Sequence, residues 1–328
     1  MAVNVTFGDI SPRTAAFAAK DLLTRGLPYL VIEKFGQAKT LPSNSSKTMK
    51  FRRYTALPNT PTALTEGVTP AGTPLTYVDV TANLVQYGNL IQISDVVQDT
   101  HEDPVLKEAT DLLGEQAAQM VEKMRYGVIK AGTNVLYGNG ASRVAVNTPI
   151  TLALQRRSTR ALKRQNARLI TKVIRSTVAY GTENVAPGYV ALIHPDCESD
   201  VRNLVGFTPA EKYGTITPWE NELGKCEDVR YVTSTVFEPF ANAGGALGTM
   251  LSTSGVSADV YPILFLGADA YGIVALKGAF AITPMVVNCK PSDSDPLAQR
   301  GSVGWKTMQT AVILNDAWMI RLEVAATA

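Results

Sequence analysis

The stretch KTMKFRRYT, residues 47–55, and the stretch TYVDVTANLVQYGNLIQIS, residues 76–94, decide how the fold of this chain is interpreted. In the first stretch, Met49 and Phe51 alternate with basic residues, and in the second, apolar residues alternate with polar ones. Alternation with a period of two is typical of strands that bury one face. A segment rich in Pro and Gly separates the two stretches, as expected for a turn region. The pattern therefore predicts a long two-stranded β-hairpin.

The length of this hairpin matters for its function. A return strand over residues 76–94 would extend about 50 Å, whereas the whole chain, if compact, would have a radius of gyration of about 20 Å. Isolated two-stranded hairpins are only marginally stable in water. We therefore expect the hairpin to project from its own domain and to rest on a neighbouring molecule.

The clearest predicted helix follows the hairpin, beginning at Asp103 and ending near Gly132. Asp103 can cap the N-terminus, and Pro104 suits the first turn. Apolar residues then recur at intervals of three and four, which is the spacing of one buried helix face. About 28 residues would extend roughly 42 Å, which is long for a globular protein.

A second helix is predicted between residues 148 and 168, and its charge is entirely basic. No acidic residue occurs between Ser142 and Thr182. The cations of this helix are Arg156, Arg157, Arg160, Lys163, Arg164 and Arg168. They form a solvated face, or they face a polyanion or the acidic residues of a neighbouring subunit. Aromatic residues do not alternate with these charges, so neither base stacking nor sequence-specific recognition is expected.

The rest of the chain predicts mixed α/β structure after an N-terminal arm. Residues 1–46 carry no core of their own and include one possible short helix at residues 13–24. The predicted later elements are strands at residues 189–195, 229–237, 262–267 and 271–278, with a short helix at 197–205. Alternating stretches on either side of Asn315 and Asp316 predict a C-terminal hairpin that returns to a sheet.

Composition excludes several classes of protein. Of the 328 residues, 45% are hydrophobic, which excludes extended disorder. The net charge is only +2, which argues against coating nucleic acid by bulk electrostatics. Charged residues make up 18%, against about 25% in ordinary soluble domains. A chain that buries much of its outside against copies of itself would explain the missing charge.

The sequence offers little support for export or membrane insertion. The N-terminus has no basic start followed by an apolar stretch, so no signal peptide is expected. No apolar stretch has the length and composition of a membrane span. Three widely spaced cysteines make no disulfide framework and fit reduced, intracellular synthesis.

Candidate catalytic and metal-binding residues are equally few. His101, Glu102 and Asp103 match no zinc or calcium spacing, and Asp103 is better explained as a helix cap. His194 and Cys197 lie too close together along one turn to form a convincing catalytic pair. The segment GGALGT at residues 244–249 lacks the residues of a phosphate-binding loop and is interpreted as a flexible loop. No catalytic residue, metal site or cofactor is predicted.

Several longer stretches resemble one family. They are KFGQAKTLPSNSSKTMKFRRYTALP, LTEGVTPAGTPLT, QYGNLIQISDVVQDTHEDPVLKEATDLLGEQAA, GTNVLYG and DPLAQRGSVGWKT. These stretches are similar to major capsid proteins of tailed bacteriophages with the HK97-like fold, and to the N4-type family among them. The resemblance implies an α+β fold with an N-arm, an extended β-hairpin loop, a peripheral domain with a long spine helix, and an axial domain. The implied boundaries are 1–42 for the N-terminal arm, 43–94 for the extended loop, 95–185 for the peripheral domain, 186–282 for the axial domain and 283–328 for the return to the peripheral domain.

The same resemblance implies a structural protein without catalytic activity. It would self-assemble into the hexamers and pentamers of an icosahedral head that encloses double-stranded DNA, and it would be located in the virion after assembly in the host cytoplasm. The implied partners are further copies of the chain, packaged DNA bound without sequence specificity, a separate scaffolding protein, a portal and a decoration protein. No membrane partner is implied.

Charged residues of the predicted hairpin and long helix are candidates for contacts between subunits. We expect basic residues of the hairpin to pair with acidic residues on the long helix of a neighbour. The candidates are Lys50, Arg52 and Arg53 on the hairpin, and Glu108, Asp111, Glu115 and Glu122 on the helix.

Three alternatives remain open from the residues alone. An encapsulin-like compartment would share the fold but enclose enzyme cargo. An intracellular α/β enzyme would require an unrecognised site, for example around His194 and Cys197. A nucleic-acid-binding module is the third alternative, and the net charge of +2 counts against it.

Overall fold

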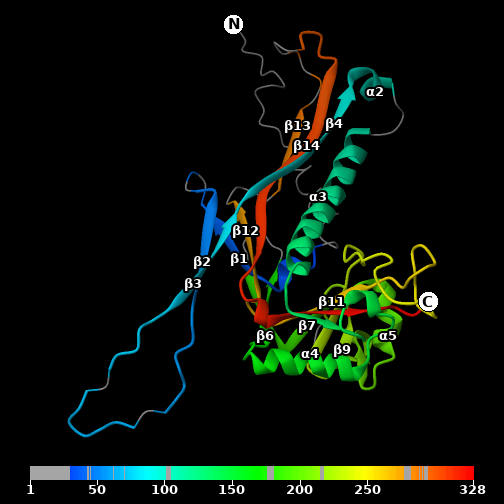
Figure 1. The fold of residues 1–328 in the computed structure, drawn as a ribbon. Coiled ribbons are helices and arrows are strands. Elements are labelled where there is room, and N and C mark those ends of the chain that lie inside the picture. The colour runs from blue at the N-terminus through cyan, green and yellow to red at the C-terminus, as the bar shows by residue number, and fades with distance from the viewer. Residues whose placement is uncertain are drawn as a thin grey trace.

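The chain forms a five-stranded sheet, an eight-stranded sheet and a two-stranded hairpin that projects away from both (Figure 1). The computed structural model describes residues 30–42, 44, 46–61, 63–69, 71–100, 105–175, 181–214, 218–276, 282–287, 289, 291 and 295–328. The possible helix at residues 13–24 and the predicted cap Asp103 lie outside these residues.

The five-stranded sheet is built around β14, a strand of 14 residues. Its strands are β1 (Gln37–Leu41), β4 (Val85–Ser94), β12 (Tyr271–Leu276), β13 (Ile282–Val287) and β14 (Arg300–Ile313). Strand β14 pairs antiparallel with β4, β12 and β13, and β1 pairs parallel with β12. The sheet therefore brings together segments from both ends of the chain.

Helix α3 (Val105–Lys130) lies along this sheet, and a short helix α2 (Asp95–Thr100) precedes it. The 26 residues of α3 extend about 39 Å at ~1.5 Å per residue. Its apolar face, with Ala109 and Leu113, packs against Trp305 of β14. The predicted long helix is confirmed. None of the helices in the described part of the chain is both long enough and apolar enough to cross a membrane.

The eight-stranded sheet collects the middle of the chain and its last strand. Its strands are β5 (Val135–Tyr137), β6 (Ile170–Arg175), β7 (Gly181–Ile193), β8 (Phe207–Pro209), β9 (Glu222–Cys226), β10 (Val229–Thr233), β11 (Tyr261–Leu266) and β15 (Met319–Val324). Helix α4 (Leu152–Arg164) packs its apolar face on this sheet, and α5 (Glu198–Arg202) follows β7. The Thr151 hydroxyl accepts the backbone N–H of Leu154, so α4 begins a few residues later than predicted.

In the residues that the structure describes, five short 3₁₀ helices connect these elements. They are η2 (Ile32–Lys34), η3 (Arg143–Ala145), η4 (Pro195–Cys197), η5 (Ala210–Lys212) and η6 (Asp316–Trp318).

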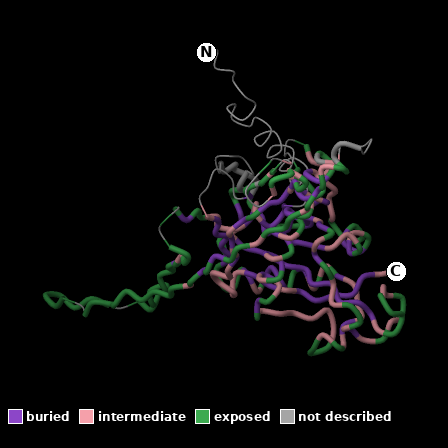
Figure 2. The backbone as a smooth tube through the Cα atoms, turned by 90° about the horizontal axis from the view of Figure 1, so that it is seen from above, coloured by how far each residue is buried: buried purple, intermediate pink, exposed green. Residues whose placement is uncertain are grey.

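One apolar cluster joins the two sheets. It contains Tyr271 from the five-stranded sheet, Leu192 and Leu264 from the eight-stranded sheet, and Ile32 and Tyr126 between them. The Tyr271 hydroxyl donates a hydrogen bond to the carbonyl oxygen of Ile32 at 2.5 Å. Buried positions gather around the sheets, whereas the hairpin is exposed along most of its length (Figure 2).

The hairpin pairs over a shorter length than predicted. Strand β2 (Thr48–Tyr54) pairs antiparallel with β3 (Tyr77–Asn83), and the described residues of 55–76 form neither helix nor strand. The chain leaves the hairpin at the fully buried Leu84 and continues as β4 against β14. The prediction of one return strand over residues 76–94 is wrong, because alternation reports which face is buried and not which strand is the partner.

The predicted C-terminal hairpin is also wrong. Strand β14 lies in the five-stranded sheet, whereas β15 pairs with β5 and β11 in the eight-stranded sheet. The turn through η6 directs the chain from one sheet to the other. A tight turn between two alternating strands permits pairing but does not require it, because each strand can bury its apolar face in a different core.

Sheet membership crosses the domain boundaries implied by the resemblance. Residues 135–175, expected in the peripheral domain, contribute β5, α4 and β6 to the unit of the eight-stranded sheet. Strand β12, expected in the axial domain, lies in the five-stranded sheet. Strand β15, expected to return to the peripheral domain, lies in the eight-stranded sheet.

The glycine-rich segment at residues 244–249 is anchored to a neighbouring segment. The backbone N–H of Gly244 donates to the carbonyl oxygen of Ala258 at 2.9 Å, and that of Gly245 donates to Val146 at 2.8 Å. A Cβ atom on Gly244 would collide with the carbonyl oxygen of Val146. Close backbone approach accounts for Gly244 here, and hydrogen bonds hold the segment at Gly244 and Gly245.

Candidate assembly surfaces

The end of the hairpin carries apolar side chains that no other part of the described chain covers. Every described residue of 55–76 is exposed, and Glu66 is the one charged residue in that range. The exposed large hydrophobic residues of the loop and the adjoining strand ends are Tyr54, Leu57, Leu64, Val68, Leu75, Tyr77 and Val78. Several exposed apolar side chains on one projecting segment are typical of a protein interface. Sequence reasoning placed the contact on the charged strands and missed this apolar loop, although its single charge was a visible signal.

The strands of the hairpin are held by a cross-strand ion pair. Arg52 donates two hydrogen bonds to Asp79, from Nε to Oδ1 at 2.8 Å and from Nη2 to Oδ2 at 2.9 Å. The guanidinium carbon also lies 4.1 Å from the centre of the Tyr77 ring. These hydrogen bonds raise the pKa of Arg52 and lower the pKa of Asp79, because they favour the charged forms. Arg52 is therefore engaged within its own hairpin.

The other two basic candidates of the hairpin remain exposed. Lys50 lies on the same face as Arg52, opposite Thr81, whereas Arg53 lies opposite Val78 on the other face. That other face also carries Phe51, which is buried against the sheet. Lys50 and Arg53 thus present charge on opposite sides of the projecting ribbon.

The acidic candidates all lie on α3, but they differ in exposure. Glu108 is exposed, and Asp111 and Glu115 are half-buried. Glu122 is fully buried. The prediction that Glu122 pairs with a neighbouring subunit is wrong, because its carboxylate is enclosed by its own chain.

Glu122 instead fastens the segment before β1 to helix α3. Its Oε1 atom accepts the backbone N–H groups of Val31 at 3.0 Å and Ile32 at 2.8 Å. One turn further along, Arg125 donates to Glu33 at 2.9 Å and to Gln309 of β14 at 2.8 Å. Burial raises the pKa of Glu122 to about 7, although Arg125 and the two N–H groups oppose this shift. The helical spacing from Ala118 to Glu122 and Ile129 was the signal that the carboxylate lies on the buried face.

The predicted basic helix presents its cations on one face. Every exposed residue of α4 except Ala153 is Arg or Lys. We call this face the α4 basic surface, and it consists of Arg156, Arg157, Arg160, Lys163 and Arg164. Arg168 is also exposed but lies beyond the helix. The opposite face buries Gln155, Ser158, Thr159 and Leu162 against the sheet.

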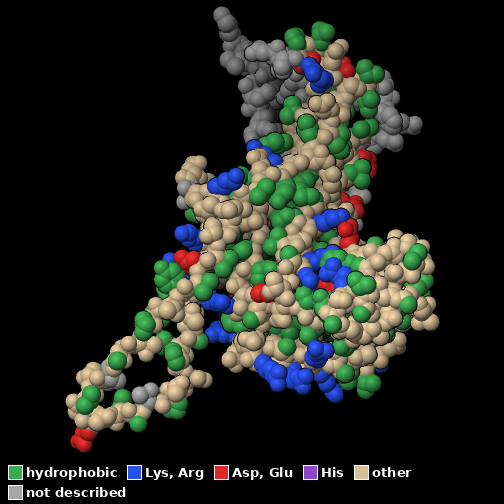
Figure 3. Space-filling model, in the orientation of Figure 1, with side chains coloured by type: hydrophobic (Ala, Val, Ile, Leu, Met, Phe, Trp, Pro, Cys, Tyr) green, Lys and Arg blue, Asp and Glu red, His purple; other side chains and the backbone are tan. Residues whose placement is uncertain are grey.

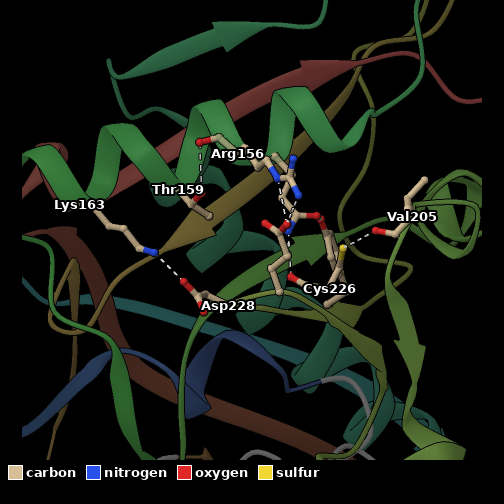
Figure 4. Close-up of polar contacts among 9 residues, drawn as sticks. Arg156, Thr159, Lys163, Val205, Cys226 and Asp228 are labelled. Carbon is tan, nitrogen blue, oxygen red and sulfur yellow. Dashed lines mark hydrogen bonds and ion pairs between the residues drawn. The ribbon is translucent and has the colours of Figure 1, made fainter.

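Two acidic residues in the turn between β9 and β10 orient part of this surface. Arg156 pairs with Glu227, and Lys163 Nζ lies 2.6 Å from an Asp228 carboxylate oxygen (Figure 4). These hydrogen bonds raise the pKa values of Arg156 and Lys163. Between helix and turn lies an open hollow of about 510 Å³, lined by Arg156, Thr159, Arg160, Lys163, Arg164 and Glu227.

The remaining candidates for chemistry form no reactive site. The Cys197 side chain is buried, and burial raises its pKa well above the usual value, so the thiol stays protonated at neutral pH. His194 Nδ1 accepts the backbone N–H of Asp196 at 3.2 Å, and its ring packs beside Tyr261. In the described part of the chain, no three His, Cys, Asp or Glu residues are grouped so as to hold a metal ion.

Comparison with known structures identifies the fold. A chain from the capsid of Ralstonia phage GP4 is 15% identical, with a TM-score of 0.66 over 89% of this chain and 87% of that chain. A chain of the cyanophage Pam1 capsid is 14% identical, with a TM-score of 0.65 over 93% of each chain. The holo-SrpI encapsulin complex from Synechococcus elongatus also matches, at 11% identity and a TM-score of 0.53 over 99% of this chain and 94% of that chain. The long helix on a sheet, the second sheet and the projecting hairpin thus define the HK97-like fold.

The family follows from the sequence match. Residues 77–317 match the family of phage capsid proteins, and the chain belongs to this family. It is a phage major capsid protein, a structural subunit of the icosahedral head in the virion, and its family is not one of enzymes. No curated protein matches the sequence.

Proposed function

We propose that copies of this chain assemble into hexamers and pentamers, and that the exposed hairpin loop of each subunit lies across its neighbour. The apolar loop is the observation that carries this proposal. Leu57, Leu64 and Leu75 are 57%, 74% and 64% exposed. Burying one leucine side chain contributes roughly 1.5–3 kcal/mol, so covering three of them would stabilise a contact between subunits substantially.

Charged residues at the base of the loop would add orientation to this contact. Lys50 and Arg53 are exposed, and Glu108 is exposed on α3. Asp111 and Glu115 lie on the same helix and are partly accessible. Exposed ion pairs are individually weak, but a shell repeats each pair in every subunit. Arg52 would act within the hairpin, by holding β2 to β3 through Asp79.

We also propose a division of the subunit that follows its sheets. The five-stranded sheet with α3 would form the peripheral domain, and the eight-stranded sheet with α4 would form the axial domain. Residues 1–42 would be the N-terminal arm, and its end is already docked through Val31 and Ile32. Within the capsid proteins, the motif QYGNLIQISDVVQ at residues 86–98 supports assignment to the N4-type family.

The remaining proposed partners belong to the assembly of a phage head. The shell would enclose double-stranded DNA bound without sequence specificity. A separate scaffolding protein would guide assembly. A portal and a decoration protein would complete the particle.

A triple substitution in the loop tests the subunit contact. Leu57→Ser, Leu64→Ser and Leu75→Ser together would remove the apolar surface without touching either sheet. We expect the variant to keep the thermal unfolding midpoint of the parent and to form at least tenfold fewer particles in electron micrographs. A tenfold change corresponds to about 1.4 kcal/mol, which is less than the roughly 1.5–3 kcal/mol that burial of one leucine contributes.

Polar changes in the same loop provide the matched control. Asn59→Ser with Thr65→Ser should leave the particle number unchanged. If the triple leucine variant assembled as well as the parent, the loop would not be the contact between subunits.

Nuclease treatment of purified particles separates a phage head from an encapsulin-like compartment. We expect protected DNA after extraction of particles made during infection. Protected enzyme cargo without nucleic acid would contradict the proposal that this shell encloses a genome.

A further inference from the structure

The α4 basic surface differs from an ordinary solvated helix face. Surfaces that serve solubility usually mix both signs of charge, whereas all five charged residues on the exposed face of α4 are positive. The chain as a whole has 31 basic and 29 acidic residues. The excess of positive charge is therefore confined to this helix and is not a property of the whole chain. It is visible along the lower edge of the molecule (Figure 3).

The same surface also differs from a contact between protein subunits. The cores of protein interfaces are apolar and depleted in charge, whereas interfaces with nucleic acid are polar and strongly basic. None of the exposed large hydrophobic residues of the described chain lies on α4 or lines the hollow beside it. The hairpin loop has the opposite composition, with exposed leucines and a single charge. The two surfaces therefore suit two different partners.

The geometry of α4 fits the backbone of a nucleic acid duplex. From Arg156 to Arg164 the helix rises about 12 Å, and a duplex carries about one phosphate charge per 1.7 Å of its axis. Each cation along this row can therefore reach a phosphate. Glu227 and Asp228 pair with Arg156 and Lys163, so Arg157, Arg160 and Arg164 supply the remaining positive charge.

The packing of α4 makes this surface rigid. Leu162 is fully buried among residues of the eight-stranded sheet, and Gln155 donates from its side-chain amide to the carbonyl oxygen of Cys226 at 2.8 Å. The Tyr231 hydroxyl in turn donates to Gln155 Oε1 at 2.7 Å. The helix backbone is thus fixed to the sheet, and the long Arg side chains alone need to adjust to a ligand.

We propose that the α4 basic surface is where the subunit contacts the phosphate backbone of packaged double-stranded DNA, without recognising its sequence. This inference rests on the proposed function, because the DNA is the genome that the shell would enclose. It places the side of the eight-stranded sheet that α4 covers towards the interior of the particle.

Binding to a short duplex tests the proposal. Unassembled full-length subunits are titrated with 30-base-pair DNA of two unrelated sequences at increasing NaCl concentration, with fluorescence anisotropy as the readout. The test variant combines Arg157→Gln, Arg160→Gln and Arg164→Gln, which leaves both ion pairs of the helix in place. Its slope of log K against log[NaCl] should be shallower by about 3, and its affinity near 0.1 M salt should fall by roughly tenfold or more for both sequences.

The control variant removes the same charge elsewhere. Lys107→Gln, Arg202→Gln and Lys212→Gln are exposed positions outside α4, and their combined change should leave the slope unchanged. Equal slopes for the parent and the α4 variant, or equal losses in both variants, would overturn the proposal. A marked preference for one of the two sequences would overturn it as well.

Particle counts by electron microscopy distinguish the remaining outcome. The α4 variant should form as many particles as the parent. Loss of particles with unchanged DNA binding would show that α4 is a contact between subunits and would refute the DNA assignment. Failure of the parent chain to form particles would instead count against the shell function, which the DNA titration does not measure.

Discussion

Glu122 illustrates how a single residue can tie the start of the described chain to its longest helix. Its carboxylate accepts two backbone N–H groups, from Val31 and Ile32, and lies beside Arg125. Glu33 is also near, and Tyr271 lies in the same buried environment. Burial is the largest effect on the carboxyl group and disfavours its charged form.

This burial predicts a specific dependence of stability on pH. The pKa of Glu122 is about 7 in the folded chain, against an ordinary value of 4.5. Between these values the folded state binds a proton that the unfolded state has lost, so stability falls as pH rises. In chemical denaturation, the difference in unfolding free energy between the parent and Glu122→Gln should shift by about 2 kcal/mol in favour of the parent when pH is lowered from 7 to 5. Glu108→Gln, at an exposed position of the same helix, is the control. If the unfolding free energy of Glu122→Gln changed with pH as that of the parent does, the prediction would be contradicted.

Replacing two different glycines by alanine should change the stability of the fold in opposite directions. A Cβ on Gly244 would collide with the carbonyl oxygen of Val146 and would lie 2.7 Å from that of Ala258. Gly244→Ala should therefore lower the unfolding free energy by about 2 kcal/mol.

Gly127 lies exposed on α3, and a Cβ atom added there would have no heavy atom close to it. Gly127→Ala should therefore raise the unfolding free energy by roughly 0.5–1 kcal/mol. Denaturant titration of both variants checks this, and a stabilised Gly244→Ala would show that the segment can move away.

At the scale of elements, the hairpin has two functions that different residues serve. Phe51 is 4% exposed and packs with Leu41, Leu84 and Val274, which holds the base of the ribbon on the five-stranded sheet. The loop beyond it is exposed throughout its described residues. The sheet therefore fixes the direction of the ribbon, while the loop remains accessible to a partner.

Hydrogen exchange can separate these two functions. Phe51→Ala should accelerate amide exchange across β2 and β3, because removing a buried phenyl ring costs about 3 kcal/mol or more and loosens the base of the hairpin. Leu57→Ala, in the exposed loop, should leave exchange in the unassembled subunit unchanged. Equal protection of β2 and β3 in the parent and in Phe51→Ala would mean that Phe51 does not anchor the hairpin.

At the scale of the whole molecule, the chain separates its surfaces by chemistry. Apolar residues gather on the projecting loop and cations gather on α4, whereas α3 carries charges of both signs. A molecule with these surfaces on different sides can contact neighbouring subunits through some of them and a polyanion through another.

A charge swap tests the proposed pairing between subunits. Lys50→Glu with Arg53→Glu should reduce particle yield, because the side of the ribbon that faces α3 of the neighbour would then carry a like charge, whichever side it is. Adding Glu108→Lys and Glu115→Lys should restore part of the yield, as counted by electron microscopy. Arg52 is left unchanged so that its pair with Asp79 stays intact. An unaltered yield in the first variant, or no recovery in the second, would contradict this pairing.

Local periodicity in the sequence was sufficient to predict several helices and strands and the faces of these elements. It predicted α3, the alternating strand β2 and the basic helix α4, because spacing along a helix or strand determines which side chains share a face. It also placed Lys50 and Arg52 on one face of the hairpin and Phe51 on the other, as the register confirms. The resemblance of several longer stretches to a known family added the HK97-like fold, which the structural matches support over most of the chain.

Only the tertiary structure decided which elements meet. Strand β4 leaves the hairpin for β14, and β14 and β15 lie in different sheets, because alternation contains no information about the pairing partner. Burial of Glu122 likewise depends on Val31 and Ile32, about 90 residues earlier in the chain. The sequence by itself thus determined the faces of the helices and strands, whereas long-range packing determined which faces are buried, which residues pair and which low-charge loop is left exposed for another subunit.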